Sequence, residues 1–250
     1  GLIPFVDPFT RTDITNATLD AAPFNVPAGS NEIIWVDIFV PKGTAAGQYT
    51  GTFTVTSTQG NSTVTLNLNV WNFLLPASPK QKSSFLYWTE GNKTNEEELM
   101  RHRIMPDKIR PVSNEPGHIN NYGLNTTNVG FWGGADQSNC TIGAAPSVSQ
   151  FQSAAATHTT GLHLYNYTAD EISGSCLINL APNIKEWARN MHQAGIDNLI
   201  TTYPNSLLFD DGSGTGRSAV DIWTVLPLQY QNNPAGTSFV ISKGDKVWSY

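Results

Sequence analysis

The chain has 250 residues, which is enough for one or two domains with a sizeable core. Charged residues make up only 14% of the chain, and the formal net charge is −6 at pH 7. This acidic balance argues against nucleic acid and anionic membranes as partners, and no apolar run reaches the roughly 18 residues of a membrane span. Low charge with abundant Thr, Asn, Ser and Gly is typical of secreted β-rich proteins, so we expect a secreted, extracellular or periplasmic location.

The first 76 residues carry the pattern of antiparallel strands. Side chains alternate with a period of two at 34–40, 49–56 and 64–70, and Gln59-Gly60-Asn61 supplies a turn between the last two segments. Such alternation over three successive segments favours a sheet with one buried and one wet face. We therefore expect residues 1–78 to form an antiparallel β-sandwich domain that supports the chemistry without performing it.

Residues 79–250 follow a different pattern, in which short apolar strands alternate with helices. A helix is expected to open at Thr94 with capping-box spacing and to stop before Pro106, and a longer one to begin near Pro182 and end at Gly195. Strands are expected at 84–88, 128–132, 161–170, 198–203, 220–225 and 246–250. This order predicts parallel β/α units, and hence a β/α barrel or an open α/β sheet. Because a full barrel takes roughly 250 residues, we expect a partial or shortened one, incomplete at its C-terminus.

The most informative stretch runs from His163 to Glu171, where a polar-aromatic strand ends in two adjacent carboxylates, Asp170 and Glu171. Neighbouring strand residues point to opposite faces, so both acids can serve one pocket only if Glu171 turns into the loop. Two carboxyl groups beside one pocket suit glycosidic bond cleavage. A solvated strand end without chemistry is the alternative interpretation.

The remaining polar residues give weaker indications. Cys140 and Cys176 are the two cysteines, and they are compatible both with a disulfide and with two separate thiols. Neither the cysteines nor the histidines have metal-ligand spacing, so no metal or other cofactor is expected. The loop Asp210-Asp-Gly-Ser-Gly-Thr-Gly216 lacks the acidic last position of a calcium loop and the lysine of a phosphate loop.

Several segments of the chain resemble glycoside hydrolase family 123 and its relatives of unassigned function. In the first half they are Trp35-Val-Asp-Ile-Phe-Val-Pro41, Ala46-Gly-Gln-Tyr-Thr-Gly51 and Val70-Trp-Asn-Phe-Leu-Leu-Pro76. In the second half they are Arg101-His-Arg-Ile104, Tyr167-Thr-Ala-Asp-Glu171, Val220-Asp-Ile-Trp223 and Gly244-Asp-Lys-Val-Trp-Ser-Tyr250. All seven occur in the same order as in that family, across nearly the whole chain.

The resemblance implies a retaining β-N-acetylgalactosaminidase with a β-sandwich before a TIM-type barrel. It implies that Glu171 is the general acid/base and that Asp170 orients the acetamido group of the substrate, whose own oxygen attacks the anomeric carbon. Ile172 departs from the family pattern, which has Pro after Asp-Glu, and the second half is short for a full barrel. Both departures favour a protein that kept the fold and lost catalysis.

Further candidates for sugar binding lie near the ends of the late strands, where barrel pockets are built. Aromatic side chains there can stack on sugar rings, and a carboxylate can hold a hydroxyl, although ordinary packing is the alternative for each. The candidates are Tyr203, Asp221, Trp223, Trp248 and Tyr250.

The sequence leaves two classes of function open. One is an enzyme that hydrolyses β-linked N-acetylhexosaminides, with N-acetylgalactosaminides favoured, and the other is a glycan-binding or structural extracellular protein that kept the fold and lost catalysis. A third interpretation is that the chain is a piece of a longer enzyme. A glycan is the expected partner in the first two cases, and the oligomeric state is not indicated.

Overall fold

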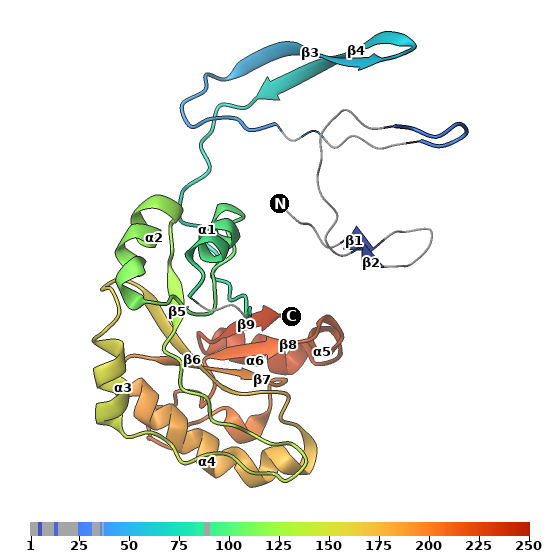
Figure 1. Ribbon diagram of the computed structural model, residues 1–250. Coiled ribbons are helices and arrows are strands. Elements are labelled where there is room, and N and C mark those ends of the chain that lie inside the picture. Colours follow the sequence, from blue (N-terminus) through green and yellow to red (C-terminus); the bar gives the residue numbers. More distant parts are fainter. Residues whose placement is uncertain (1–4, 7–12, 15–24, 32–35, 37, 88–90) are drawn as a thin grey trace. The chain divides into compact units, whose positions relative to one another are not determined.

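The structure is a computed structural model that describes residues 5–6, 13–14, 25–31, 36, 38–87 and 91–250 (Figure 1). The chain divides into two compact units, Gly1–Leu74 and Leu75–Tyr250. Among the described residues, no helix combines the length and the apolar character that crossing a bilayer requires.

The first unit contains two antiparallel pairs of strands. The short strands β1 (Phe5–Val6) and β2 (Asp13–Ile14) form one pair, and β3 (Gly47–Ser57) and β4 (Gly60–Val70) form a long hairpin. The hairpin runs in unbroken register from Gly47 opposite Val70 to Ser57 opposite Gly60. Its apolar and threonine-rich faces alternate, so the strand predictions for 49–56 and 64–70 are confirmed.

The prediction of a β-sandwich is wrong. In the described part of the first unit, strand pairing stops at two separate two-stranded sheets, whereas a sandwich needs two larger sheets face to face. Phe53 is 40% exposed and Val64 is 54% exposed on the apolar face of the hairpin. Of the strand expected at 34–40, residues 36 and 38–40 are not in a strand, and 34, 35 and 37 lie outside the described residues. Alternation specifies the two faces of a strand, but not what covers them.

The second unit is built on a parallel sheet with the sequential order β5-β6-β7-β8-β9. The strands are β5 (Thr126–Asn128), β6 (His163–Ala169), β7 (Asp197–Thr201), β8 (Ile222–Val225) and β9 (Lys246–Ser249). The helices are α1 (Lys93–Arg101), α2 (Glu115–Tyr122), α3 (Val148–Ala155), α4 (Gly174–His192), α5 (Pro227–Asn232) and α6 (Pro234–Ser242), with 3₁₀ turns at Val112–Asn114 and Ser206–Leu208.

Two further backbone positions extend this sheet beyond β5. Phe85 and Pro106 form a parallel bridge, and the Asn128 amide donates a hydrogen bond to the Asp107 carbonyl at 2.8 Å. No strand joins β9 to the Phe85 position among the described residues, so the sheet remains open as a curled half-barrel. A sandwich followed by a barrel is therefore not the observed fold, although the sequential parallel order is that of barrel strands.

The two faces of the sheet have different surroundings. One face packs on α4 through a large apolar cluster that includes Ala169, Ile184, Ile200 and Trp223. The other face carries a smaller cluster of Tyr165, Leu199 and Ile222, with Tyr167 and Trp248 beside it. We call these the outer and the inner face of the half-barrel. Strand residues alternate between them, as the pleat requires.

The sequence predicted that α4 starts near Pro182. The helix begins eight positions earlier, at Gly174, and Pro182 lies inside it. Proline in a helix interior removes one hydrogen bond and costs about 3 kcal/mol. The buried residues Leu177, Leu180 and Ala181 precede it at helical spacing, and their burial offsets that cost. The prediction of a longest helix near 182–194 located the right element but not its first half.

Candidate active site

A β-bulge in β6 decides which side chains reach the inner face. Tyr167 is opposite Leu199 in β7, but the next pair is Ala169 opposite Ile200, so Thr168 is an extra residue. Ala169 therefore packs on the outer face with Ile200. The following residue, Asp170, lines the inner cavity. Without the bulge, strict alternation from Tyr167 would aim Asp170 at the helices, and bulges commonly re-aim side chains in this way next to active sites.

Glu171 leaves the strand by a sharp change of backbone direction. Its φ of 47° lies in the left-handed region, which non-glycine residues rarely adopt. Ile172 is buried in the outer cluster, and its carbonyl accepts a hydrogen bond from the Thr202 hydroxyl at 2.8 Å. This anchor holds the turn, so the carboxylates of both Asp170 and Glu171 line the same cavity. The condition under which both acids can serve one pocket is therefore met, although the strand ends at Ala169, one residue before the expected end.

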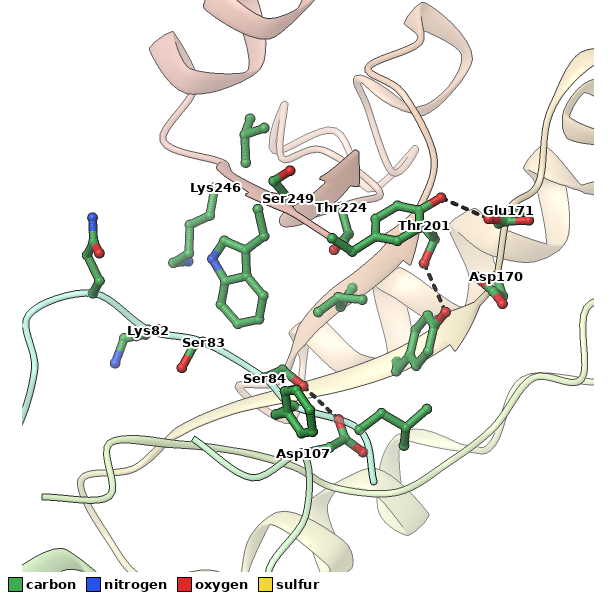
Figure 2. A pocket seen from close by; sticks show the side chains of 18 of the residues that line it. Lys82, Ser83, Ser84, Asp107, Asp170, Glu171, Thr201, Thr224, Lys246 and Ser249 are labelled. Atoms are coloured by element: carbon green, nitrogen blue, oxygen red, sulfur yellow. Dashed lines mark hydrogen bonds between the residues drawn. The ribbon is translucent and has the colours of Figure 1, made fainter. Parts of the chain in front are cut away.

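The cavity occupies the inner face of the half-barrel and has a volume of about 1010 Å³. Figure 2 shows Asp170 and Glu171 on one side of it, Lys82 and Lys246 on the other, and Asp107 on a third. Beside aliphatic and hydroxyl side chains, three groups of residues line it: the acids Asp107, Asp170 and Glu171, the aromatic residues Phe85, Tyr167, Trp248 and Tyr250, and the bases Lys80, Lys82 and Lys246.

A tyrosine contacts each carboxylate of the pair. The Tyr250 hydroxyl donates a hydrogen bond to Glu171 Oε1 at 2.9 Å. Burial and the adjacent Glu171 carboxylate raise the pKa of Tyr250 to about 12, so this phenol remains a donor at neutral pH. Burial, with the hydrogen bond and charge of Asp170, also raises the pKa of Tyr167 above its ordinary range. Tyr167 in turn shares a 2.9 Å hydrogen bond with Thr201 of β7.

Asp107 is a third carboxylate of the cavity, and the sequence analysis missed it. Its Oδ1 accepts hydrogen bonds from the Tyr165 hydroxyl at 2.8 Å and from the Ser84 hydroxyl at 3.0 Å, and Asn128 Nδ2 donates to both of its oxygens. Asp107 itself is almost completely buried. It follows Pro106 in a short extended segment with no periodic pattern, so only the sheet contact to Phe85 could have identified it.

The structure brings some of the predicted site residues together and separates others. Asp170, Glu171, Trp248 and Tyr250 all line the cavity. Trp223 does not, because it points to the outer face, is fully buried and donates from Nε1 to Asp245 at 3.1 Å. The prediction that Trp223 binds sugar beside Trp248 is therefore wrong. In the pairing of β8 with β9, Trp223 is opposite Val247, so the two indoles lie on opposite faces of the sheet.

Asp221 and Tyr203 also lie away from the cavity. Asp221 precedes β8, at the amino end of the sheet, where its carboxylate accepts hydrogen bonds from His192 at 2.9 Å and from Arg217 at 2.9 Å. Tyr203 is half-buried beyond the end of β7 and is not one of the residues around the cavity. The prediction that Asp221 and Tyr203 bind sugar in this cavity is therefore wrong.

The amino end of the sheet holds a network of charged groups around Asp197. This carboxylate accepts hydrogen bonds from His163 at 2.7 Å, Lys246 at 2.8 Å and Arg217 at 2.9 Å. Burial alone would raise the pKa of Asp197, but the hydrogen bonds from His163 and Lys246 hold it well below its usual range. Each of these groups has a protein partner, which is typical of a structural network. In the described part of the chain, no cluster of His, Cys, Asp and Glu is arranged to hold a metal ion.

Comparisons with known proteins do not assign the chain to a family. No protein-family model and no curated protein matches the chain. One solved structure that matches is described as a "putative alpha-galactosidase" from Bacteroides fragilis, with 13% identity and a TM-score of 0.25. The match covers 72% of this chain and 45% of that chain, so the present chain spans less than half of that protein. A similarity this weak carries no argument about fold or function, and membership of glycoside hydrolase family 123 is not supported by these comparisons.

Proposed function

We propose that the protein is a glycoside hydrolase that uses Asp170 and Glu171. The observation that carries the proposal is the placement of two consecutive carboxylates at the end of β6, beside one cavity and next to Trp248 and Tyr250. Carboxylate pairs perform acid–base chemistry on glycosidic bonds, and aromatic side chains give flat apolar surfaces for sugar rings. The proposal includes a glycan as substrate and a secreted or periplasmic location, which the low charge content favours.

The finer proposal is a substrate-assisted, retaining hydrolysis of β-N-acetylhexosaminides, with N-acetylgalactosaminides favoured. Most retaining glycosidases use a nucleophile and an acid that flank the scissile bond from opposite sides. Two consecutive residues on one backbone turn approach a substrate from the same side, so they do not suit that arrangement. A substrate that supplies its own nucleophile removes this requirement. The adjacency of Asp170 and Glu171 therefore favours a sugar with a 2-acetamido group.

In the first step, Glu171 donates a proton to the leaving glycosidic oxygen while the acetamido oxygen of the sugar attacks the anomeric carbon. The C1–O bond to the aglycone breaks, and a cyclic oxazolinium forms with its positive charge next to Asp170. Asp170 accepts the acetamido N–H and stabilises that charge. In the second step, the Glu171 carboxylate takes a proton from water, whose oxygen attacks C1 and reopens the ring, so the configuration at C1 is retained.

The Tyr250 phenol is placed to hold the Glu171 carboxyl group in one orientation through both steps. Its hydrogen bond to Oε1 leaves Oε2 for the proton that is transferred. Trp248 lies on the inner face of β9, where its indole can contact the apolar side of the sugar.

The test is the release of an aryl alcohol from an aryl β-N-acetylgalactosaminide and from the matching galactoside, which lacks the acetamido group. We expect cleavage of the first substrate only. Glu171→Gln should lose about 10²–10⁴-fold in kcat with a poor leaving group and recover part of it with an activated one, whereas Asp170→Asn should not recover. Equal turnover of both sugars would eliminate the substrate-assisted mechanism. Saturable glycan binding without any turnover would instead support a binding protein.

A further inference from the structure

Cys140 and Cys176 lie together although they are far apart in the chain. Cys140 sits in the turn Asp136–Thr141, and Cys176 lies in the first turn of α4. Cys140 packs against the outer apolar cluster that contains Cys176. The Sγ atoms of the two residues contact consecutive carbonyls of the same turn, Gln137 at 3.9 Å and Asp136 at 3.8 Å, respectively. Both residues are free thiols in this structure, and the nearby Cys140 thiol is one of the groups that raise the pKa of Cys176.

The turn that carries Cys140 is held in place by contacts that do not involve sulfur. Backbone hydrogen bonds join Asp136 and Thr141 in both directions, at 2.8 and 3.3 Å. Gln137 makes two hydrogen bonds to the backbone of Ser173, at 3.0 and 3.3 Å, and Ser173 is the residue before α4. These contacts fix the turn on the start of the helix, so the two thiols are brought together before any covalent bond forms.

We propose that Cys140 and Cys176 form a disulfide bond that ties the turn Asp136–Thr141 to the start of α4. The reaction is thiol–disulfide exchange with a low-molecular-weight disulfide such as oxidised glutathione. One thiolate attacks a glutathione sulfur and releases one glutathione thiolate, which gives a mixed disulfide. The second thiolate then attacks the protein sulfur of this mixed disulfide and releases the other glutathione. Two protein thiols lose two protons and two electrons, and one glutathione disulfide becomes two thiols.

The surroundings of the two residues indicate the order of these steps. Cys176 is buried, and its burial and the neighbouring Cys140 thiol raise its pKa to about 11. Cys140 is only partly buried, so it is the accessible residue and attacks the external disulfide. Cys176 completes the bond from within the protein.

The position of the bond gives it a consequence for the cavity. Ser173, which Gln137 holds, is two positions after Glu171 in the chain. A covalent link between the turn and α4 therefore restrains the backbone that follows the carboxylate pair. It also closes the loop of residues 140–176 in the unfolded chain, which lowers the entropy of that state.

The experiment is peptide mapping of the 250-residue protein after equilibration with oxidised glutathione and quenching with an alkylating reagent. A glutamate-specific protease separates the two cysteines, because Glu115, Glu171 and Glu186 bound the peptides 116–171 and 172–186. We expect these two peptides to be joined, with a mass two hydrogens below their sum, and to separate after reduction. Alkylated thiols on both peptides, or separate glutathione adducts, would overturn the proposal.

A thermal measurement distinguishes a bond from mere proximity. The oxidised protein should melt roughly 6–12 °C above the reduced protein, as expected for a disulfide in a unit of this size. Cys140→Ser and Cys176→Ala should each melt at one temperature regardless of glutathione. Because Cys140 is only partly buried, Cys140→Ser remains informative if the core variant Cys176→Ala does not fold. Equal melting temperatures of the oxidised and reduced wild type would count against the bond. None of these readouts depends on glycosidase activity.

Discussion

The Tyr250 hydroxyl lies 2.9 Å from Glu171 Oε1, which joins the residue after β9 to the turn that follows β6. Two strands, β7 and β8, separate β6 from β9 in the sheet. Such a contact across the inner face is possible because the sheet curls. The curl of the sheet brings Tyr250 within hydrogen-bonding distance of Glu171, and this hydrogen bond orients the proposed acid/base.

This contact predicts the ionisation behaviour of Tyr250. Burial and the Glu171 carboxylate raise the pKa of this phenol to about 12. In Glu171→Gln the negative charge is absent, and a phenolate at position 250 is repelled less. We expect the pKa of Tyr250 to fall toward the ordinary tyrosine value near 10, while burial keeps part of the shift. Ultraviolet difference titration of the phenolate, with Tyr250→Phe subtracted to isolate the signal, measures this change. An unchanged titration would mean that the hydrogen bond is absent in solution.

Trp223 and Trp248 should respond differently to the same substitution. Trp223→Phe removes buried volume and the hydrogen bond to Asp245, so it should lower the free energy of unfolding by about 1–3 kcal/mol and leave glycan affinity unchanged. Trp248→Phe changes a partly buried ring at the cavity and should weaken glycan binding several-fold with a smaller loss of stability. Denaturant unfolding and ligand titration of both variants test the pair. A loss of affinity in Trp223→Phe alone would reverse the assignment of the two faces.

Asp197 should make stability depend on pH in the acid range. Its folded pKa is depressed by His163 and Lys246, so its contribution to stability is complete above the unfolded value of about 3.9 and is lost as the pH falls through the folded pKa. Asp197→Asn should therefore be destabilised most at pH 5–7, and the difference from wild type should shrink below about pH 4.

Urea unfolding of wild type and Asp197→Asn at a series of pH values measures this difference. Glu186→Gln, on the exposed side of α4, is the matched control and should show no comparable trend. A stability difference that is constant from pH 7 to pH 3 would contradict the prediction.

Asp107 should be a structural residue of the inner face. Asp107→Asn keeps the shape but places an amide donor among the donors Tyr165, Ser84 and Asn128. One of these buried donors then loses its acceptor, so we expect a loss of about 1–3 kcal/mol in the free energy of unfolding. Tyr165→Phe removes a donor and leaves Asp107 with Ser84 and Asn128, and it should cost less. A fully stable Asp107→Asn with a raised KM would instead indicate direct contact with substrate.

The sequence alone determined most strands and the turn that carries the proposed chemistry. Periodicity of two predicted the β3–β4 hairpin, because this signal depends only on near neighbours. The capping-box spacing at Thr94 located α1 but not its start, because Asn92 caps the helix and Thr94 lies inside it. The departure of Glu171 from the strand also followed from local reasoning. The sequence predicted only the second half of helix α4. Proline is common at the first position of a helix, so Pro182 indicates a helix start, although buried apolar residues before it belong to the same helix.

Tertiary structure decided which side chains meet. The bulge at Thr168 shifts the inward and outward alternation of side chains by one residue and so places Asp170 on the inner face. No local sequence pattern predicts this bulge. The register of β8 against β9 places Trp223 on the outer face, away from the cavity. The bridge between Phe85 and Pro106 brings Asp107 to the edge of the cavity. In each case the deciding interaction joins distant parts of the chain, and its geometry depends on packing that a one-dimensional pattern does not contain.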